Sequence, residues 1–127
     1  MKVLPDDRRI LGEVMKRLAD SNIVDLIITT GGTGFSESDV TPEATLDIVE
    51  RQVPGIPEAM RAYSMQFTKR AMLSRAAAGI RKQTLIVNFP GSPKSLKESL
   101  EYILPELIHG VEILQGIAKE CAAPKEA

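Results

Sequence analysis

Two short glycine-rich stretches in this 127-residue chain could bind a phosphate or a similar anion. Gly31-Gly32-Thr33-Gly34 directly follows an apolar run at 23–30, and Pro90-Gly91-Ser92 directly follows another at 84–89. Loops without bulky side chains let backbone N–H groups approach a phosphate, and a following helix N-terminus adds partial positive charge. One such loop is often only a tight turn, but two of them favour an oxyanion ligand.

Neither loop matches a standard nucleotide-binding motif. No Gly-Lys-[Ser/Thr] follows at P-loop spacing, and Gly32-Thr33-Gly34 continues with Phe35-Ser36-Glu37 instead of completing G-x-G-x-x-G. Hydroxyl groups are nevertheless present at the loops, on Thr33, Ser36 and Ser92. The sequence therefore predicts an anion site of another kind.

Two aspartates could hold a metal ion beside such a phosphate. Asp39 lies between the first loop and Thr41-Pro42-Glu43, a pattern typical of a helix start with Thr as the cap. Its carboxylate could support that cap or bind Mg²⁺. Position alone does not choose between the two for Asp39. Asp6 is open to the same interpretations, with a helix cap first and a metal or substrate contact second.

The spacing of apolar residues predicts the elements that must position these groups. The runs at 23–30 and 84–89 predict buried strands, and residues 71–80 are ambiguous. The first predicted helix covers 7–20 with Asp6 and Asp7 as caps, and the second runs from 41 to about 52. A third helix is predicted to begin at Pro57. A fourth is predicted to be capped by Ser95, and the last to run from Pro105 to near Gly116. Strands separated by helices predict an α/β fold with a parallel sheet, whose ligand crevice lies at the carboxyl ends of the strands.

Composition and charge narrow the class of function. Sixteen Lys and Arg against seventeen Asp and Glu leave a net charge of -1, so no basic excess favours nucleic acid or an anionic membrane. No apolar run approaches the ~20 residues of a membrane span, and the first residues do not resemble a signal peptide. The single cysteine, Cys121, predicts neither a disulfide framework nor a multi-thiolate zinc site. We therefore expect one cytoplasmic domain at 1–117 and a solvated tail at 118–127, with no nucleic-acid or membrane partner.

Five motifs stand in a fixed order along the chain. They are Leu4-Pro5-Asp6; Thr29-Thr30-Gly31-Gly32-Thr33-Gly34 with Asp39-Val40-Thr41-Pro42-Glu43-Ala44; Pro54-Gly55-Ile56; Leu73-Ser74-Arg75 with Gly79-Ile80-Arg81; and Asn88-Phe89-Pro90-Gly91-Ser92-Pro93-Lys94. Together they resemble the molybdopterin adenylyltransferase family, the MogA/MoaB group that includes the N-terminal domain of gephyrin. The resemblance runs from residue 3 to about residue 116, which is nearly the whole chain.

The resemblance implies a three-layer, open, mostly parallel sheet with helices on both faces. It implies transfer of AMP from ATP to the phosphate of molybdopterin, with pyrophosphate released and Mg²⁺ required, in a homotrimer. Asp6 and Asp39 are implied to be the catalytic aspartates that hold the metal. The implied substrate-binding residues are Gly31, Gly32, Thr33, Gly34 and Ser36 around phosphate, and Ser74, Arg75, Pro90, Gly91, Ser92 and Lys94 along the pterin and phosphate crevice.

Two of these assignments have an ordinary structural alternative. Ser74-Arg75 could be a turn with a surface ion pair, and Lys94 could be a solvated lysine near a helix start.

Relative to the family pattern, the chain lacks a segment before Pro5-Asp6. That segment has roughly 40 residues, more than the ~30 of one βαβ unit, and supplies a strand beside the one expected at 23–30. We therefore expect an N-terminally truncated fold with an exposed strand edge and exposed apolar helix faces. A truncated or miscalled gene product, completion by swapping or oligomerisation, and local rearrangement all remain open. The alternative functions are accordingly a non-catalytic module for molybdopterin or phosphate binding or for assembly, and an inactive fragment.

Overall fold

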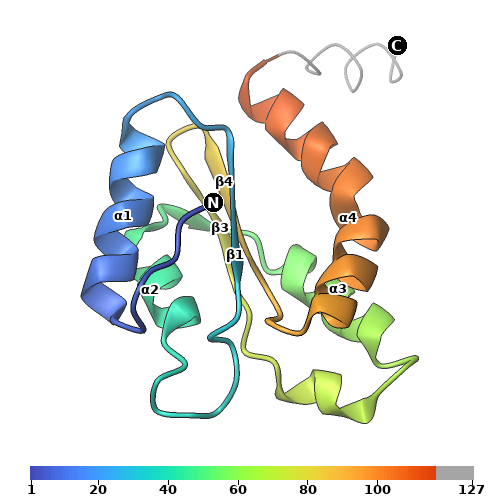
Figure 1. Cartoon of the computed structure of the whole chain (residues 1–127). Coiled ribbons are helices and arrows are strands. Elements are labelled where there is room, and N and C mark those ends of the chain that lie inside the picture. The colour runs from blue at the N-terminus through green and yellow to red at the C-terminus, as the bar shows by residue number, and fades with distance from the viewer. Residues whose placement is uncertain (117–127) are drawn as a thin grey trace, which may run out of the picture.

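The structure is a computed structural model that describes residues 1–116, which contain nine helices and strands (Figure 1). In chain order they are α1 (Arg8–Asp20), β1 (Leu26–Thr30), α2 (Thr41–Ile48), β2 (Arg51–Gln52), α3 (Gly55–Ser64), the 3₁₀ helix η1 (Lys69–Leu73), β3 (Ala78–Arg81), β4 (Thr84–Phe89) and α4 (Pro93–Leu114). The tail predicted at 118–127 lies outside the described residues.

A four-stranded sheet forms the middle layer, with strand order β1-β4-β3-β2. β1 and β4 are parallel, with Thr30 opposite Phe89, and a long connection through helices joins them. The other two pairings are antiparallel, so the described sheet is mixed, whereas a mostly parallel one was expected. The reason is the connection between β3 and β4, where Lys82 has a φ of 54° in a turn too short to join parallel strands.

Helices cover both faces of the sheet, which confirms the predicted α/β fold (Figure 1). β4 is buried along its whole length, and its side chains pack on both sides. The core on the α3 and α4 side comprises Met60, Ala78, Leu85, Val87, Phe89, Ile103 and Leu107. The core on the α1 and α2 side comprises Met15, Ala44, Ile48 and Ile86.

α1 forms where it was predicted, and its cap is Asp7, not Asp6. The Asp7 carboxylate accepts a hydrogen bond from the Ile10 N–H at 2.9 Å, which satisfies one of the donors that a helix start leaves unpaired. Arg8 in the first turn forms an ion pair of 2.7 Å with Asp47 on α2. The ion pair therefore fastens the N-terminal turn of α1 to α2.

α2 departs from the prediction at both ends. Thr41 is its first residue, and the N-cap is Val40, which makes no side-chain cap. The helix ends at Ile48, because Val49 is extended and the Glu50 N–H donates to the Ile80 carbonyl at 2.8 Å. Pairing with the sheet as β2 thus replaces the last turn that was predicted to reach Gln52.

α4 is one helix of 22 residues, whereas two were predicted with a start at Pro105. Its cap is Ser92, whose hydroxyl accepts from the Ser95 N–H at 3.5 Å, so the expected cap at Ser95 is wrong. Pro105 removes one intrahelical hydrogen bond. Ile103 and Leu107 on either side of it are buried against the sheet, and their burial offsets that cost.

The strand predicted at 23–30 and the ambiguous stretch at 71–80 also differ in detail from the prediction. β1 begins at Leu26, later than predicted, and as an outer strand of the described sheet it leaves Ile28 38% exposed. Residues 71–80 divide into the end of η1 and the start of β3. No helix within residues 1–116 has the length and apolar character that crossing a membrane requires.

Candidate functional site

The two glycine loops meet at one edge of the sheet, because the parallel neighbours β1 and β4 both end there. The Gly31 N–H donates to the Phe89 carbonyl at 2.9 Å. Gly31 and Gly32 have φ angles of 86° and 70°, which favour glycine. A Cβ on Gly91 would lie 3.1 Å from the Gly31 Cα, so the two backbones pack directly on each other.

Asp39 braces the first loop from inside. Its Oδ2 accepts from the Ser36 N–H at 2.9 Å, and its own N–H donates to the Ser36 carbonyl at the same distance. The Asp39 carboxylate does not cap α2, whose start has no side-chain cap. Its second oxygen, Oδ1, has no hydrogen bond within residues 1–116 and remains available to a ligand or a metal ion.

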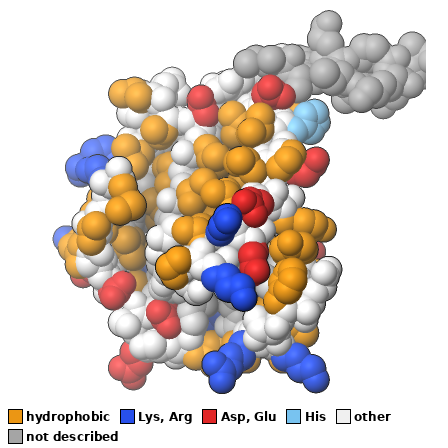
Figure 2. Space-filling model, turned by 45° about the vertical axis from the view of Figure 1, so that its right-hand side comes forward, with side chains coloured by type: hydrophobic (Ala, Val, Ile, Leu, Met, Phe, Trp, Pro, Cys, Tyr) orange, Lys and Arg blue, Asp and Glu red, His pale blue; other side chains and the backbone are white. Residues whose placement is uncertain are grey.

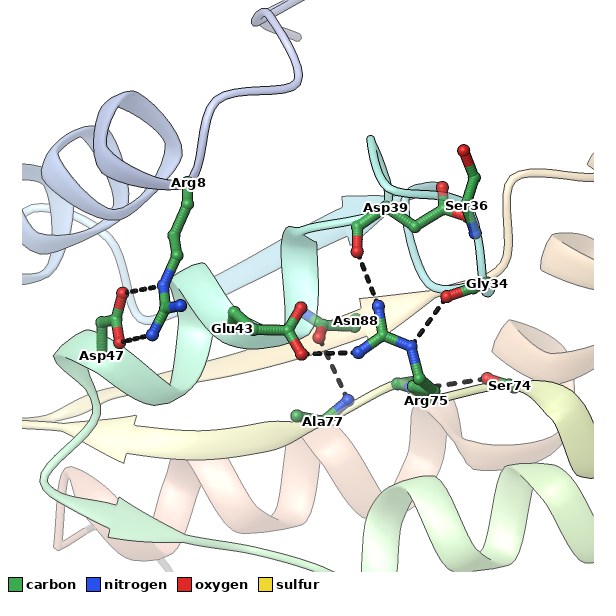
Figure 3. Close-up of polar contacts among 11 residues, drawn as sticks. Arg8, Gly34, Ser36, Asp39, Glu43, Asp47, Ser74, Arg75, Ala77 and Asn88 are labelled. Carbon is green, nitrogen blue, oxygen red and sulfur yellow. Dashed lines mark hydrogen bonds and ion pairs between the residues drawn. The ribbon is translucent and has the colours of Figure 1, made fainter.

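Arg75 holds the same loop from the β3 side (Figure 3). Its guanidinium donates to the carbonyls of Gly34 at 2.7 Å and Asp39 at 2.6 Å, and to the Glu43 carboxylate at 2.5 Å. The backbone N–H of Arg75 also donates to the Thr33 carbonyl at 2.8 Å. One residue thus connects the loop, the first turn of α2 and the segment before β3.

The Glu43–Arg75 contact also changes the ionisation of Glu43. The hydrogen bond from Arg75 lowers the pKa of the Glu43 carboxyl group below its ordinary value, although partial burial opposes this effect. The carboxylate is therefore held in its charged form beside the loop.

A cavity of about 410 Å³ opens beside the glycine loops. It lies between the first loop, α3, η1 and the first turns of α4. Its lining residues are Thr33, Gly34, Phe35, Pro57, Met60, Arg61, Ser64, Thr68, Arg70, Ala71, Leu73, Ser74, Ala76, Pro90, Ser95 and Ser99.

The lining combines positive charge, hydroxyl groups and apolar walls. Arg61 and Arg70 are the charged residues among the lining residues, and neither Asp nor Glu is among them. Six of the lining residues are Ser or Thr, and the apolar contribution includes Phe35, Met60 and Leu73. Such a cavity suits a ligand with an apolar body and an anionic group.

The cavity brings together some of the predicted site residues. Thr33, Gly34, Ser74 and Pro90 line it. The other predicted residues do not: Asp6, Gly31, Gly32, Ser36, Asp39, Arg75, Gly91, Ser92 and Lys94. Several of these instead build the loops around it, since Gly31 and Gly91 pack together, Asp39 and Arg75 brace the first loop and Ser92 caps α4. Asp6 and Lys94 are exposed outside the cavity.

Sequence reasoning missed most of the cavity wall. Arg61, Ser64, Thr68 and Arg70 come from a stretch read only for its apolar spacing. Ser95 and Ser99 are spaced by four residues, which places both on one face of α4. That spacing was the available signal, because a serine pair on the buried side of a helix is unusual.

A buried amide supports the strands behind the site. Asn88, which is fully buried in β4, donates to the hydroxyls of Thr29 at 3.0 Å and Thr45 at 2.9 Å. The side-chain oxygen of Asn88, Oδ1, accepts a hydrogen bond from the Ala77 N–H at 3.0 Å. The signal in the sequence was one amide within the apolar run 84–89.

The described residues offer little for a metal site built from protein ligands alone. No three His, Cys, Asp or Glu side chains gather into a cluster within residues 1–116. Mg²⁺ commonly takes one or two carboxylates and completes its shell with water and substrate phosphates. With its available Oδ1, Asp39 fits Mg²⁺ that arrives with phosphate groups.

Comparison with known proteins gives one consistent family. The family described as "probable molybdopterin binding domain" matches residues 1–109. The molybdopterin adenylyltransferase of Haemophilus influenzae is 45% identical over 116 residues, covering 91% of this chain and 58% of its own length. Gephyrin of Dictyostelium discoideum is 42% identical over 118 residues, covering 93% of this chain and 16% of its own.

Solved structures show the same relationship in three dimensions. The molybdopterin biosynthesis enzyme MoaB of Thermus thermophilus aligns with a TM-score of 0.81 and 46% identity, covering 88% of this chain and 70% of that one. The chain spans about 58–65% of the length of the curated bacterial relatives it matches.

Proposed function

The chain belongs to the family of probable molybdopterin binding domains, and we propose from this premise that it acts in molybdenum cofactor biosynthesis by binding molybdopterin for adenylylation. The observation that carries the proposal is the cavity beside the glycine loops. Its acid-free lining, two arginines and six hydroxyl residues suit a phosphate-bearing heterocycle, and its apolar residues suit the ring.

The proposed reaction transfers AMP from ATP to molybdopterin. An oxygen of the molybdopterin phosphate forms a bond to the α-phosphorus of ATP. The bond from that phosphorus to the oxygen bridging to the β-phosphate breaks, and its electron pair leaves with pyrophosphate. The reaction needs positioning and charge neutralisation more than a protein nucleophile, and hydrogen-bond donors held in place provide both.

The residues of this chain would divide these tasks. The N–H groups of Gly32, Thr33 and Gly34 and the hydroxyls of Thr33 and Ser74 would orient phosphate oxygens, because the Gly31 N–H is already bonded to the Phe89 carbonyl. Asp39 would hold Mg²⁺ brought in with the triphosphate, and Mg²⁺ would supply neutralisation of the phosphate charge. Arg75 would act indirectly, because its hydrogen bonds hold the loop in the shape that presents these donors.

A second candidate is a module that binds without catalysing. The chain spans 58–65% of the matched bacterial adenylyltransferases, so residues outside this span could be needed for turnover. The cavity and its glycine loops lie within residues 1–116. A module of this kind would bind its ligand without the residues that lie outside the matched span.

Thermal melts of the 127-residue chain test the proposal. We expect molybdopterin and MgATP each to raise the melting midpoint, because only binding to the folded state stabilises it. A pterin without phosphate is the control and should raise the midpoint less. A midpoint unchanged by molybdopterin at saturating concentration would contradict the proposal. Chromatography of the reaction mixture separates the two candidates, since adenylylated product indicates catalysis and binding without product indicates the module.

A further inference from the structure

We propose that Arg70 binds a phosphate group of a substrate at the η1 side of the cavity, as an anion subsite additional to the glycine loops. The inference rests on the proposed function and deepens it, because adenylyl transfer brings together two phosphate-bearing substrates in one site. In Figure 1 the yellow-green segment that contains η1 lies apart from the loop after β1, and residues of both segments line the cavity.

The two arginines of the cavity are not equivalent. Arg61 on α3 uses its Nη1 to donate to the carbonyls of Ser74 at 3.1 Å and Ala76 at 3.2 Å, so it holds the segment before β3. The Arg70 guanidinium has neither an ion pair nor a side-chain hydrogen bond within residues 1–116. Its five N–H donors therefore remain available to a ligand.

The backbone beneath Arg70 is held in place. Thr68 caps η1, its hydroxyl accepting from the Arg70 N–H at 3.2 Å, and its carbonyl accepts from the Ala71 N–H at 3.3 Å. The Ser74 N–H closes the segment by donating to the Ala71 carbonyl at 3.1 Å. The side chain thus extends from a defined point on the cavity wall.

Two hydroxyl residues near Arg70 in the sequence also line the cavity. They are Ser64, at the end of α3, and Thr68, the cap of η1. A guanidinium with neighbouring hydroxyls is suited to phosphate, because its planar donors match two phosphate oxygens at once. Since neither Asp nor Glu is among the lining residues, no acidic side chain of the cavity wall competes with an anionic ligand for Arg70.

Lys69 provides a matched control within the chain. It is the preceding residue, it carries the same charge and it is exposed, but it does not line the cavity. Replacing either residue by Gln changes the net charge of the chain equally. A difference between the two variants therefore reports on position and not on total charge.

The test compares dissociation constants of the full 127-residue chain, of Arg70→Gln and of Lys69→Gln, measured by calorimetry with MgATP and with molybdopterin. We expect Arg70→Gln to weaken at least one ligand by roughly tenfold, a loss that shrinks as salt rises, while Lys69→Gln changes both by less than about twofold. Arg70→Lys should lie between them, because it keeps the charge and loses the paired donors.

The pattern of losses identifies the phosphate. Loss for MgATP alone assigns the subsite to the triphosphate, and loss for molybdopterin alone assigns it to the pterin phosphate. Equal affinities of Arg70→Gln and Lys69→Gln, with the unaltered chain binding molybdopterin, would overturn the Arg70 subsite and leave the proposed function standing. Absence of molybdopterin binding by the unaltered chain would overturn both.

Discussion

At the scale of single residues, Arg75 and Asp39 both hold the loop that follows β1 in shape. Asp39 bonds the Ser36 N–H within the loop, and Arg75 bonds the carbonyls of Gly34 and Asp39 from the segment before β3. A loop with two left-handed glycines has high conformational freedom when unfolded, so it needs such contacts to stay in one shape. Both residues are therefore bracing residues of the site, whatever else Asp39 binds.

Replacing Arg75 by Ala removes three side-chain hydrogen bonds at a half-buried position. We expect the free energy of unfolding to fall by about 2 kcal/mol, measured by urea denaturation followed by circular dichroism. Arg8→Ala is the matched control, because it removes a more exposed Arg–Asp pair and should lower the free energy of unfolding by less than Arg75→Ala does. Equal, small losses in the two variants would show that Arg75 does not brace the loop.

Replacing Asp39 by Asn separates its two roles. The Asn side-chain oxygen can still accept from the Ser36 N–H, so the free energy of unfolding should change by less than about 0.5 kcal/mol. The negative charge is lost, and we expect Mg²⁺-dependent ATP affinity to fall by about tenfold in calorimetric titrations. Asp39→Ala should lower both stability and affinity. Unchanged Mg²⁺ dependence in Asp39→Asn would restrict Asp39 to the structural role.

At the scale of elements, side chains fasten α2 to its neighbours through ion pairs. Glu43 pairs with Arg75 before β3, and Asp47 pairs with Arg8 on α1. A third pair joins Asp20, at the end of α1, to Arg81 on β3. In each case the arginine hydrogen bond is the main cause that lowers the pKa of the carboxyl group.

These lowered pKa values predict how stability depends on pH. A carboxyl group whose pKa is lower in the folded chain contributes stability above its unfolded pKa and loses it as pH falls through the folded pKa. We therefore expect the melting midpoint to fall once pH drops below about 4.5, the ordinary value for Glu. Glu43→Gln should make the melting midpoint depend less steeply on pH in this range. The pH dependence that remains should come from Asp20 and Asp47. An unchanged slope in Glu43→Gln, measured by scanning calorimetry from pH 6 to 3, would contradict a stabilising Glu43–Arg75 pair.

At the scale of the whole molecule, much apolar surface is uncovered. Figure 2, which turns the α4 side of Figure 1 toward the viewer, shows hydrophobic side chains spread across that face. On α4 itself, Tyr102 is 53%, Ile108 50% and Ile113 51% exposed. Tyr102 also stacks on Tyr63 of α3 with 4.0 Å between ring centroids. Apolar surface of this extent is typical of a face that meets another protein surface.

We expect this surface to be partly covered in a homotrimer, the assembly implied by the family resemblance. Sedimentation equilibrium at micromolar concentration measures the mass directly. A value near three times the chain mass of 13.9 kDa is the expected result. A monomeric mass under these conditions would contradict the trimer.

Much of this molecule follows from local sequence. The glycine loops, the two strands before them and the cap of α1 depend on residues within a few positions of one another, and they lie close to where they were predicted. Only β4 is buried as predicted, because β1 is an outer strand of the described sheet and none of its five residues is buried. The Asp39–Thr41-Pro42 pattern correctly indicated a helix start, although the cap residue differs. Local patterns were sufficient here because turn conformation and apolar periodicity are set by neighbouring residues.

Long-range contacts decided the rest. β2 exists because Glu50 and the residues after it bond β3, and α4 continues through Pro105 because both sides of that position are buried. The cavity wall from α3 and η1 and the position of Arg75 depend on packing between segments more than 30 residues apart. Apolar spacing along one segment does not specify which surface that segment will meet. The sequence by itself therefore determined the glycine loops and the family, and the tertiary structure decided which side chains bound the cavity and which ones brace it.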